Sequence, residues 1–315
     1  MNAIGGYFEL ELREGKHYHK NALHLNTARN CFEYTLRAKQ YTHVYIPYYT
    51  CEVMLEPLHK LDISYTFYSI SNLLEPVNYP RLKEGEAFLY TNYFGVKQSE
   101  VIRLAEFYRR QLIVDNSQAF FAPVISGIDT FYSARKFFGV PDGAYLCTDK
   151  ILNEELKMDV SYERMSHLLK RIDLNAEDAY VDFKLNDKYL NGQPILRMSK
   201  LTERVLKSID YDSAKQRRLE NFNLMDEYLR NKNLFCLNLS KDDVPMAYPY
   251  LLDNGKFIKE DLIKHRVFVP TYWENVKEWT ANDWERNLVD NLVCLPIDHR
   301  YGKKEIELMI NNYGI

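Results

Sequence analysis

The stretch LIVDNSQAF, residues 112–120, decides the fold class that we expect for this chain. Leu112, Ile113 and Val114 are apolar without alternation, which is typical of a strand buried on both faces of a parallel sheet. The run stops at Asp115, a carboxylate that is costly to bury unless a cation pairs with it. Because ligands of open α/β sheets bind at the carboxyl ends of the strands, we place Asp115 at a ligand-binding edge.

Strands and helices alternate on the amino-terminal side of this stretch. β-Branched and aromatic residues predict strands at 43–50, 62–70 and 86–95, and the spacing of apolar residues predicts helices at 26–39 and 99–111. Asn26 or Thr27 can cap the first helix, and Ser99 can cap the second. This alternation indicates an α/β protein built on a mostly parallel sheet with flanking helices.

The pattern changes beyond residue 150. Residues 151–200 read as helical and polar, and residues 199–231 read as one long helix. Short strands are expected at 246–252, 267–273 and 292–297, and a helix is expected near the carboxyl terminus. We therefore expect a large α/β domain at 1–196, followed by the long helix and a smaller α+β domain at 197–315.

The charge and hydropathy of the chain exclude some classes of function. The net charge is −3 over 315 residues, so a nucleic-acid partner is not expected. No apolar run approaches the roughly 18 residues that span a bilayer. The first residues, MNAIGGYFELELREG, carry acidic side chains and do not read as a signal peptide. No membrane partner is expected.

The cysteines and two neighbouring histidines point to a protein without a metal or a disulfide framework. The five cysteines are odd in number and scattered, which favours a reducing cytoplasm (Cys31, Cys51, Cys147, Cys236, Cys294). His17 and His19 lie in a charged stretch without a third ligand nearby, so we expect them on a solvated face and expect no metal.

A lysine with aromatic neighbours follows the decisive strand. In DTFYSARKFFGVPDGAYL, residues 129–146, Lys136 lies between Tyr132 and the pair Phe137 and Phe138. A lysine in such surroundings either extends its amine to the surface or takes part in chemistry. We expect Lys136 to be buried and chemically active.

Three features together match the needs of pyridoxal phosphate. The helix that starts at Asn26 offers free N–H groups to a phosphate, and the Ser133 hydroxyl can join them. Asp115 would keep the pyridine nitrogen protonated, and Lys136 would form a Schiff base with the aldehyde and carry protons. Taken singly, each feature is ordinary: a strand-ending Asp is often a turn former, and a Ser-x-x-Lys can be a surface turn.

Several motifs in this order resemble one enzyme family. They run through nearly the whole chain: NTAR (26–29), IPYYT (46–50), TNYFG (91–95), DNSQA (115–119), SARK (133–136), RMSKL (197–201) and LPIDHRYGKKEIELMINNY (295–313). The chain resembles the DegT/StrS family of sugar aminotransferases, which have the fold of type I pyridoxal-phosphate enzymes. The resemblance implies a large domain with a mostly parallel sheet and a smaller carboxyl-terminal α+β domain.

The resemblance also implies roles for particular residues. Asp115 would pair with the pyridine nitrogen, and Gln118 would lie against the cofactor near its phenolic oxygen. Ser133 and the backbone of Thr27 and Ala28 would bind phosphate, and Lys136 would form the Schiff base. Arg29 and Arg135 are candidates for phosphate or carboxylate contacts, and we expect Arg197 to anchor the long helix.

The activity implied is transfer of an amino group from glutamate, or a similar donor, to a keto sugar that is linked to a nucleotide. Such enzymes act as homodimers, in the cytoplasm, in sugar and polysaccharide biosynthesis. Two alternatives stay open. One is a dehydratase or lyase with the same cofactor, although such relatives usually replace the lysine with histidine. The other is a non-catalytic protein that keeps the fold and binds a partner.

The sequence departs from the family pattern at several positions. Cys51 stands where an aromatic residue usually stacks on the cofactor, and Tyr49 or Tyr93 are the candidate substitutes. Asn92 stands where a histidine is common. The chain is short for the family, and the loss falls between Lys136 and the RMSKL motif. These departures concern the sugar-nucleotide pocket rather than the cofactor.

Overall fold

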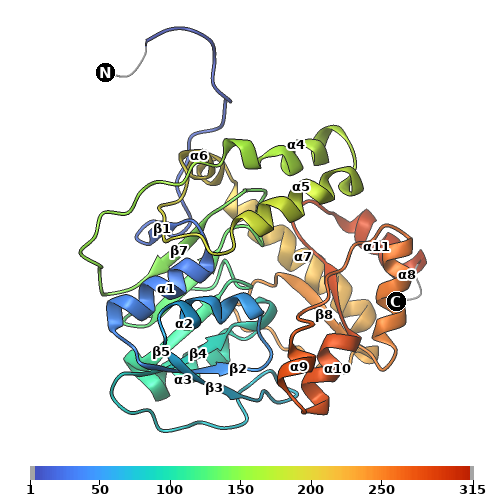
Figure 1. Cartoon of the computed structure of the whole chain (residues 1–315). Helices are drawn as coiled ribbons and strands as arrows, with labels where there is room; N and C mark the ends of the chain where they lie inside the picture. The colour runs from blue at the N-terminus through green and yellow to red at the C-terminus, as the bar shows by residue number, and fades with distance from the viewer. Residues whose placement is uncertain (1–3, 313–315) are drawn as a thin grey trace.

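The computed structural model describes residues 4–312, which contain two β-sheets (Figure 1). The larger sheet has seven strands in the order β1-β7-β6-β5-β4-β2-β3. Its strands are β1 (Leu23–Leu25), β2 (His43–Pro47), β3 (Ser64–Tyr68), β4 (Glu86–Thr91), β5 (Leu112–Asn116), β6 (Asp129–Ser133) and β7 (Ala144–Cys147). Strands β2 to β6 are parallel, and β7 is antiparallel to both β6 and β1. The expected mostly parallel α/β fold is confirmed.

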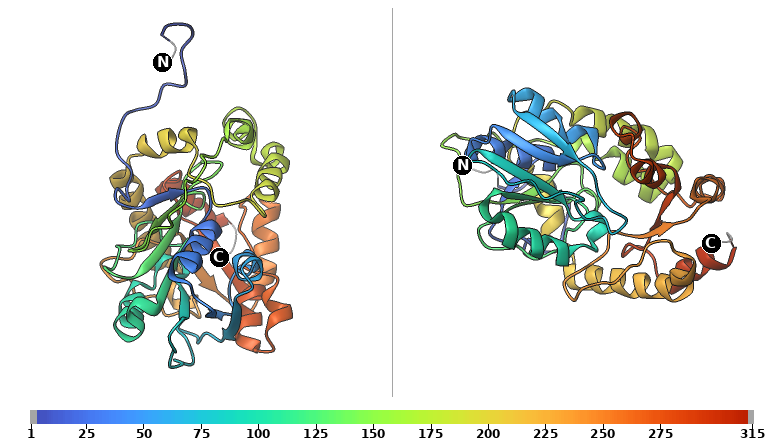
Figure 2. Two further views of the ribbon diagram at one scale, coloured as in Figure 1. Left: turned by 60° about the vertical axis from the view of Figure 1, so that its left-hand side comes forward. Right: turned by 90° about the horizontal axis from the view of Figure 1, so that it is seen from below.

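Both faces of the larger sheet are buried, as the apolar run 112–114 predicts. Leu112 and Val114 belong to one hydrophobic core, and Ile113 belongs to the core on the opposite face. Helices α1 (Ala28–Lys39) and α2 (Glu56–Lys60) cover the face of Ile113, whereas α3 (Gln98–Tyr108) and α7 (Tyr211–Leu229) cover the other (Figure 2). Because strand side chains alternate, the next residue, Asp115, points toward the α1 face.

The start of α1 is stabilised by a residue next to it in sequence, whereas the start of α3 is stabilised by a residue far away in sequence. The Thr27 hydroxyl accepts a hydrogen bond from the Asn30 N–H at 3.2 Å, so Thr27 is the expected cap of α1. The expected cap Ser99 of α3 is wrong, because the helix begins at Gln98. Its Gln98 N–H is instead satisfied by the carboxylate of Asp243, 145 residues away, at 2.9 Å.

The expected long helix at 199–231 is wrong, because it is two helices. Helix α6 (Lys200–Lys207) ends before residue 209, and α7 starts after Asp210. The Asp210 carboxylate accepts the Ser213 N–H at 3.0 Å and so caps a new helix. Because the backbone of a capping residue is not helical, Asp210 separates α7 from the helix before it.

The second sheet pairs β8 (Ala247–Leu251) with β9 (Leu292–Pro296) in antiparallel fashion. Helices α8 (Gly255–Lys264), α9 (Val276–Trp279), α10 (Asp283–Asn291) and α11 (Lys303–Asn312) accompany it (Figure 1). Strands were expected at 246–252 and 292–297 and are found there, but the expected strand at 267–273 is wrong. That segment instead packs against the larger sheet: the Tyr49 hydroxyl donates to the Tyr272 carbonyl at 3.2 Å.

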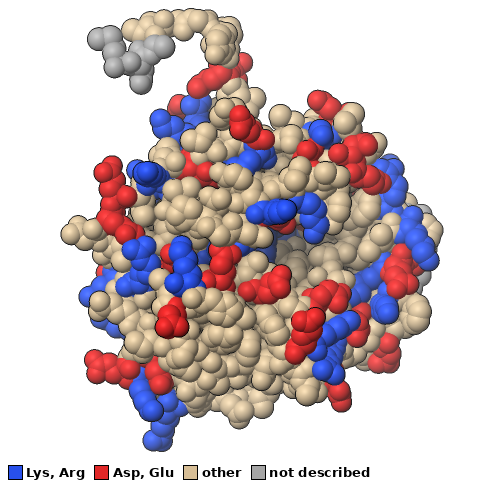
Figure 3. All heavy atoms as spheres, viewed as in Figure 1, with Lys and Arg blue, Asp and Glu red and all other residues tan. Residues whose placement is uncertain are grey.

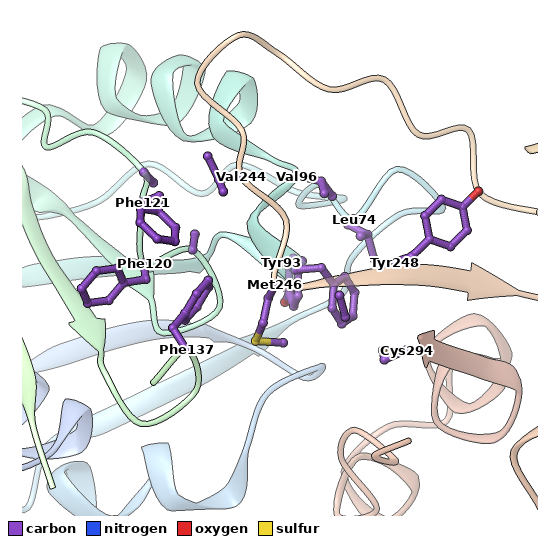
Figure 4. Close-up of a cluster of buried hydrophobic side chains, with 14 of the residues drawn as sticks. Leu74, Tyr93, Val96, Phe120, Phe121, Phe137, Val244, Met246, Tyr248 and Cys294 are labelled. Carbon is purple, nitrogen blue, oxygen red and sulfur yellow. The ribbon is translucent and has the colours of Figure 1, made fainter. Parts of the chain in front are cut away.

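One hydrophobic core joins the two sheets. Phe120, Phe137 and Tyr93 from the larger sheet's loops lie in it with Met246 and Tyr248 from the second sheet (Figure 4). The Met246 N–H also donates to the Phe94 carbonyl at 2.8 Å. The two parts of the chain therefore share buried apolar surface, which is the main favourable term in their association.

Helices α4 (Ser166–Asp173) and α5 (Ala176–Tyr189) form an antiparallel pair, drawn in light green in Figure 1. The expectation that residues 151–200 are helical holds only for this pair, because residues 151–165 and 190–199 contain no α-helix. The outer surface of the pair is also less polar than expected, since Ile172 and Val181 are 80% and 67% exposed. Acidic and basic side chains are interspersed over the face seen in Figure 3. No helix within residues 4–312 has the length and apolarity needed to cross a membrane.

The expectation that His17 and His19 lie on a solvated face is wrong. Each residue is only 7% exposed. The His19 ring lies 3.8 Å from the Tyr132 ring, stacked on it, and its Nε2 is 2.8 Å from the Phe120 carbonyl. Burial lowers the pKa of His19 to about 4, so this imidazole is neutral at physiological pH.

Candidate active site

The residues singled out in the sequence come together at the carboxyl edge of the larger sheet. Asp115 pairs with Thr91 of β4 and with Phe131 of β6, so the three parallel strands end at nearly the same level. Phe131 belongs to the core on the α1 face, and Ser133, two residues later, therefore points to the same side as Asp115. The amino terminus of α1 lies on this face as well.

Asp115 is a buried carboxylate with few partners. It is 5% exposed, and one carboxylate oxygen accepts the Ser117 N–H at 2.8 Å. Burial raises the pKa of Asp115, and the Lys136 ammonium and hydrogen bonds from Ser117 oppose that rise. The carboxylate thus has a nearby cation but retains capacity to accept a further hydrogen bond.

Hydrogen-bond donors face the same corner. The Cys31 N–H makes the first intrahelical bond of α1, to the Thr27 carbonyl at 3.0 Å, which leaves the N–H groups of Ala28 and Arg29 free. The Ser133 hydroxyl has no hydrogen bond within residues 4–312. Free N–H groups at a helix start and an adjacent hydroxyl are a common binding site for phosphate.

Lys136 lies in this corner but is exposed, so the expectation of a buried lysine is wrong. After β6 the chain turns, with the Phe137 N–H donating to the Ala134 carbonyl at 3.0 Å. This turn sends Phe137 and Phe138 into the core and leaves Lys136 outside it. Across the described part of the chain, the ammonium has no ion pair or hydrogen bond, although it acts electrostatically on Asp115 and Cys51.

Gln118 is fully buried, with 0% exposure. Its amide oxygen accepts the Phe94 N–H at 2.9 Å, while its Nε2 is buried and finds no acceptor among residues 4–312. A buried donor without an acceptor costs about 1–3 kcal/mol. Such a group is one of the marks of a site that a ligand completes.

The arginines near the site are already paired. Arg29 donates to the Glu56 carboxylate and to the Asn191 side chain, and Arg135 forms an ion pair with Asp187 of α5. As the structure stands, neither guanidinium is free to receive a phosphate or a carboxylate. Arg197 is exposed and joins Leu25 and Met158 through backbone bridges, so its side chain does not anchor a helix.

The departures from the family pattern have local explanations. Tyr49 and Tyr93 are fully buried, and the Tyr93 hydroxyl donates to the Tyr49 carbonyl at 2.9 Å. Asn92 is a structural residue, since its side chain accepts the Lys97 N–H at 3.1 Å. Burial raises the pKa of the partly buried Cys51 thiol, and the cation of Lys136 opposes this rise.

Two groups of residues at the site were not found from the sequence. From the carboxyl-terminal half, the Asn275 side chain donates to the Thr50 carbonyl at 3.0 Å, beside Cys51. After the lysine, Gly143 has φ of +113°, and its N–H donates to the Asn26 carbonyl at 2.6 Å, just before α1. The Gly143 turn was a readable signal. Asn275 carried none, because its partner is 225 residues away.

This corner therefore offers a buried carboxylate, free N–H groups, a hydroxyl, an unpaired amide and an unpaired amine. A ligand with a phosphate, a protonated ring nitrogen and a carbonyl group that reacts with amines would use each of them. Carboxylate and amine together also provide a place for proton transfer.

Comparison with known proteins identifies the fold. No protein-family model and no curated protein matches the sequence. Among solved structures, the chain is similar to a DegT DnrJ EryC1 StrS aminotransferase from Brucella abortus, with 12% identity and a TM-score of 0.60 over 92% of this chain and 84% of that one. It is also similar to the sugar aminotransferase CalS13 from Micromonospora echinospora, with 12% identity and a TM-score of 0.58 over 92% and 85%.

A third similar structure is the PLP form of Spr1654 from Streptococcus pneumoniae. The identity is 13% and the TM-score 0.62, over 93% of this chain and 86% of that one. At these identities the likeness establishes the fold: the chain has the α/β fold that the resemblance to the DegT/StrS family implied.

Proposed function

We propose that the protein is a pyridoxal-phosphate-dependent aminotransferase that transfers an amino group from glutamate, or a similar donor, to a keto sugar linked to a nucleotide. The observation that carries this proposal is the set of unmatched polar groups around Asp115. Four kinds of donor gather there without acceptors among residues 4–312: Lys136, Ser133, the Gln118 amide and the first N–H groups of α1.

The donor set fits the cofactor group by group. The N–H groups of Ala28 and its neighbour, with the cap residue Thr27 and the Ser133 hydroxyl, would hold the phosphate. Asp115 would accept a hydrogen bond from the protonated pyridine nitrogen, and Gln118 would donate its free Nε2 hydrogen to an acceptor on the ring. Lys136 would hold the aldehyde carbon covalently.

When bound, pyridoxal phosphate withdraws electrons from the substrate's α-carbon through its pyridinium ring. Asp115 maintains that pyridinium, since its buried carboxylate favours a nearby cation. The Lys136 amine would be the group that takes the α-proton of the donor and supplies a proton to the acceptor. Its exposure and lack of partners leave it free to move between these positions.

The same proposal covers the organisation of the chain. We assign residues 1–196 to a large domain and residues 197–315 to a small one, and the hydrogen bond from the Asn275 side chain to the Thr50 carbonyl supports contact between them near the site. The enzyme works as a homodimer in the cytoplasm, as the resemblance implies. Sedimentation of the purified chain should then give a species of twice 37.4 kDa.

The absorbance spectrum of the purified protein with added pyridoxal phosphate tests the proposal. We expect a visible band from cofactor bound at Lys136, and we expect glutamate to convert it to a near-ultraviolet band. A visible band that glutamate leaves unchanged would point to another donor or to a lyase. If no visible band forms, the chain is not an enzyme of this class.

Replacement of the lysine should have the largest effect. Lys136→Ala is expected to abolish the visible band and to lower turnover by at least about 10³-fold, since it removes both the covalent link and the proton carrier. The matched control is Lys150→Ala, because Lys150 is also an exposed lysine on a loop after the sheet. Turnover that survives in the Lys136 variant would refute the assignment.

A further inference from the structure

A second cluster of polar side chains lies outside the candidate active site. It joins His17 from the amino-terminal segment, His24 from β1 and Glu203 from the first turn of α6. His17 Nε2 is 2.9 Å from one Glu203 carboxylate oxygen, and His24 Nδ1 is 2.8 Å from the other. One possible ligand atom from each residue can be chosen so that all lie within 4.8 Å of one another.

The cluster has the surroundings of a metal centre. The second nitrogen of His17, Nδ1, is 2.7 Å from the Tyr145 hydroxyl. A hydrogen bond at the far nitrogen fixes the ring orientation and directs the near nitrogen to the ion, as is usual for metal-bound histidines. The second nitrogen of His24, Nε2, is buried without a partner within residues 4–312. The two imidazole rings lie 4.3 Å apart.

We propose that His17, His24 and Glu203 form a binding site for a divalent transition-metal ion, with Zn²⁺ as the best match. Two imidazoles and one carboxylate are an established ligand set for zinc, with bonds of roughly 2.0–2.2 Å and a fourth position left for water. Neighbouring ligand atoms of a tetrahedral ion lie about 3.3 Å apart at these bond lengths. The two histidine–carboxylate spacings, 2.8 and 2.9 Å to different Glu203 oxygens, are slightly shorter than this, and the wider spacings within the set, up to 4.8 Å, must contract when the ion binds.

An ion binds the nitrogen of each imidazole that faces Glu203, so that nitrogen must be free of its proton. Each neutral imidazole carries one proton, and a shift to the other tautomer frees the nitrogen that faces Glu203. For His17 the proton then lies on Nδ1 and is donated to the Tyr145 hydroxyl. The carboxylate exchanges two hydrogen bonds for coordination of the ion.

The setting selects among cations. Glu203 borders a surface groove of about 450 Å³. The groove is also lined by basic side chains (Arg197, Lys200, Arg204 and Lys207). Mg²⁺ and Ca²⁺ prefer oxygen ligands and would find one carboxylate here. Imidazole nitrogens favour Zn²⁺ and its neighbours in the first transition row.

A bound ion would fasten the amino-terminal segment to the body of the protein. His17 and Glu203 are 186 residues apart in the sequence, so an ion bound by both would link the amino-terminal segment to α6. A side chain at Gly15 would meet the Lys207 carbonyl oxygen at 2.3 Å, so backbone contacts backbone there. Metal binding in the native state alone stabilises that state by mass action.

Calorimetric titration of the chelator-treated protein with Zn²⁺ tests the proposal. We expect one equivalent to bind with micromolar affinity or better and to raise Tm, whereas Mg²⁺ should do neither. Loss of a residue that hydrogen-bonds a metal ligand weakens metal binding by roughly 10–100-fold, and Tyr145→Phe should fall in that range. Glu203→Gln and His24→Gln each remove a ligand and should weaken Zn²⁺ binding by more than that. The matched control His59→Gln alters an exposed histidine elsewhere and should bind like the unaltered protein.

Co²⁺ serves as a spectroscopic probe of the ligands. Nitrogen and oxygen ligands give visible d–d bands without an intense near-ultraviolet thiolate band. Absence of binding, unchanged affinity in both ligand variants, or a thiolate band from a site at a cysteine would each overturn the proposal. Circular dichroism without metal verifies that the variants are folded. If one of the two ligand variants does not fold, the Zn²⁺ affinity of the other still tests the proposal.

Discussion

Two buried aspartates lie a short distance apart in the chain and differ in every respect except burial. Asp142 has 0% exposure and accepts hydrogen bonds from the Ser199 N–H at 2.9 Å, the Ser199 hydroxyl at 2.7 Å and the Thr202 hydroxyl. Asp115 has 5% exposure and has hydrogen-bond partners only in the neighbouring Ser117, whose N–H donates to it at 2.8 Å, with an exposed ammonium nearby.

The difference separates a structural carboxylate from a functional one. Asp142 fastens the turn after Lys136 to the start of α6, and its bonding capacity is largely used by the protein. Asp115 has capacity left over, at a strand end where a ligand can use it. Burial alone therefore does not mark a site, whereas a buried charge with unused hydrogen-bonding capacity does.

Asp115→Asn should produce the largest change in this comparison. We expect kcat to fall by roughly 10²–10³-fold, as when one preorganised electrostatic partner is removed from an active site. Steady-state kinetics with glutamate would measure it. The Asp142 position offers the contrast, since a variant there that still folds should keep its turnover within a few-fold.

The same Asp115 variant should be more stable than the parent without cofactor at pH 7. The pKa of Asp115 is raised in the folded state, so its contribution to stability is present at low pH and is lost as pH rises through the folded pKa. The Tm advantage of Asn should therefore appear at neutral pH and disappear in acid. An advantage that grows in acid would contradict this account.

Asp142→Ala should mainly lower stability. The change leaves the Ser199 and Thr202 donors without their acceptor, and we expect a loss of about 3 kcal/mol in the free energy of unfolding, measured by urea titration. Asp253→Ala, at an exposed position, is the control and should stay within about 0.5 kcal/mol. A similar loss of unfolding free energy in both variants would show that the hydrogen bonds of Asp142 do not contribute more to stability than an exposed aspartate does.

Ser133→Ala should give the smallest effect. It removes one hydrogen bond to the proposed phosphate and should weaken pyridoxal-phosphate binding by at least about tenfold, because a hydrogen bond to a charged group contributes roughly 1.5–3 kcal/mol. Stability without cofactor should not change, since the hydroxyl has no protein partner in the described structure. Equilibrium dialysis gives the affinity, and Ser126→Ala on the exposed loop before β6 is the control.

Much of the larger sheet could be predicted because its signals are local. The apolar run 112–114 predicts a strand buried on both faces, and Thr27 predicts the start of α1. The errors concern segments with distant partners. Ser99 was favoured as a cap because it is near in sequence, but Asp243 fills that role from 145 residues away. The 267–273 segment has strand-like residues but no strand to pair with.

The candidate site divides in the same way. The order of Thr27, Asp115, Gln118, Ser133 and Lys136 could be read along the chain, and the structure gathers them at one edge because parallel strands end together. The exposure of Lys136 could not be read, since only the turn after β6 shows that its aromatic neighbours enter the core while the lysine stays outside. The ion pairs of Arg29 with Glu56 and of Arg135 with Asp187 could not be predicted from the sequence either.

By itself, the amino-acid sequence determined the strands and helices whose hydrophobic periodicity is strong, and the positions of the carboxylate and the amine relative to them. Only the tertiary structure decided which polar groups find partners. Asp142 meets Ser199 at a separation of 57 residues, and His17 meets Glu203 at 186. Such pairs depend on how the chain folds back on itself, because a hydrogen bond needs atoms within about 3 Å, whatever their distance in sequence.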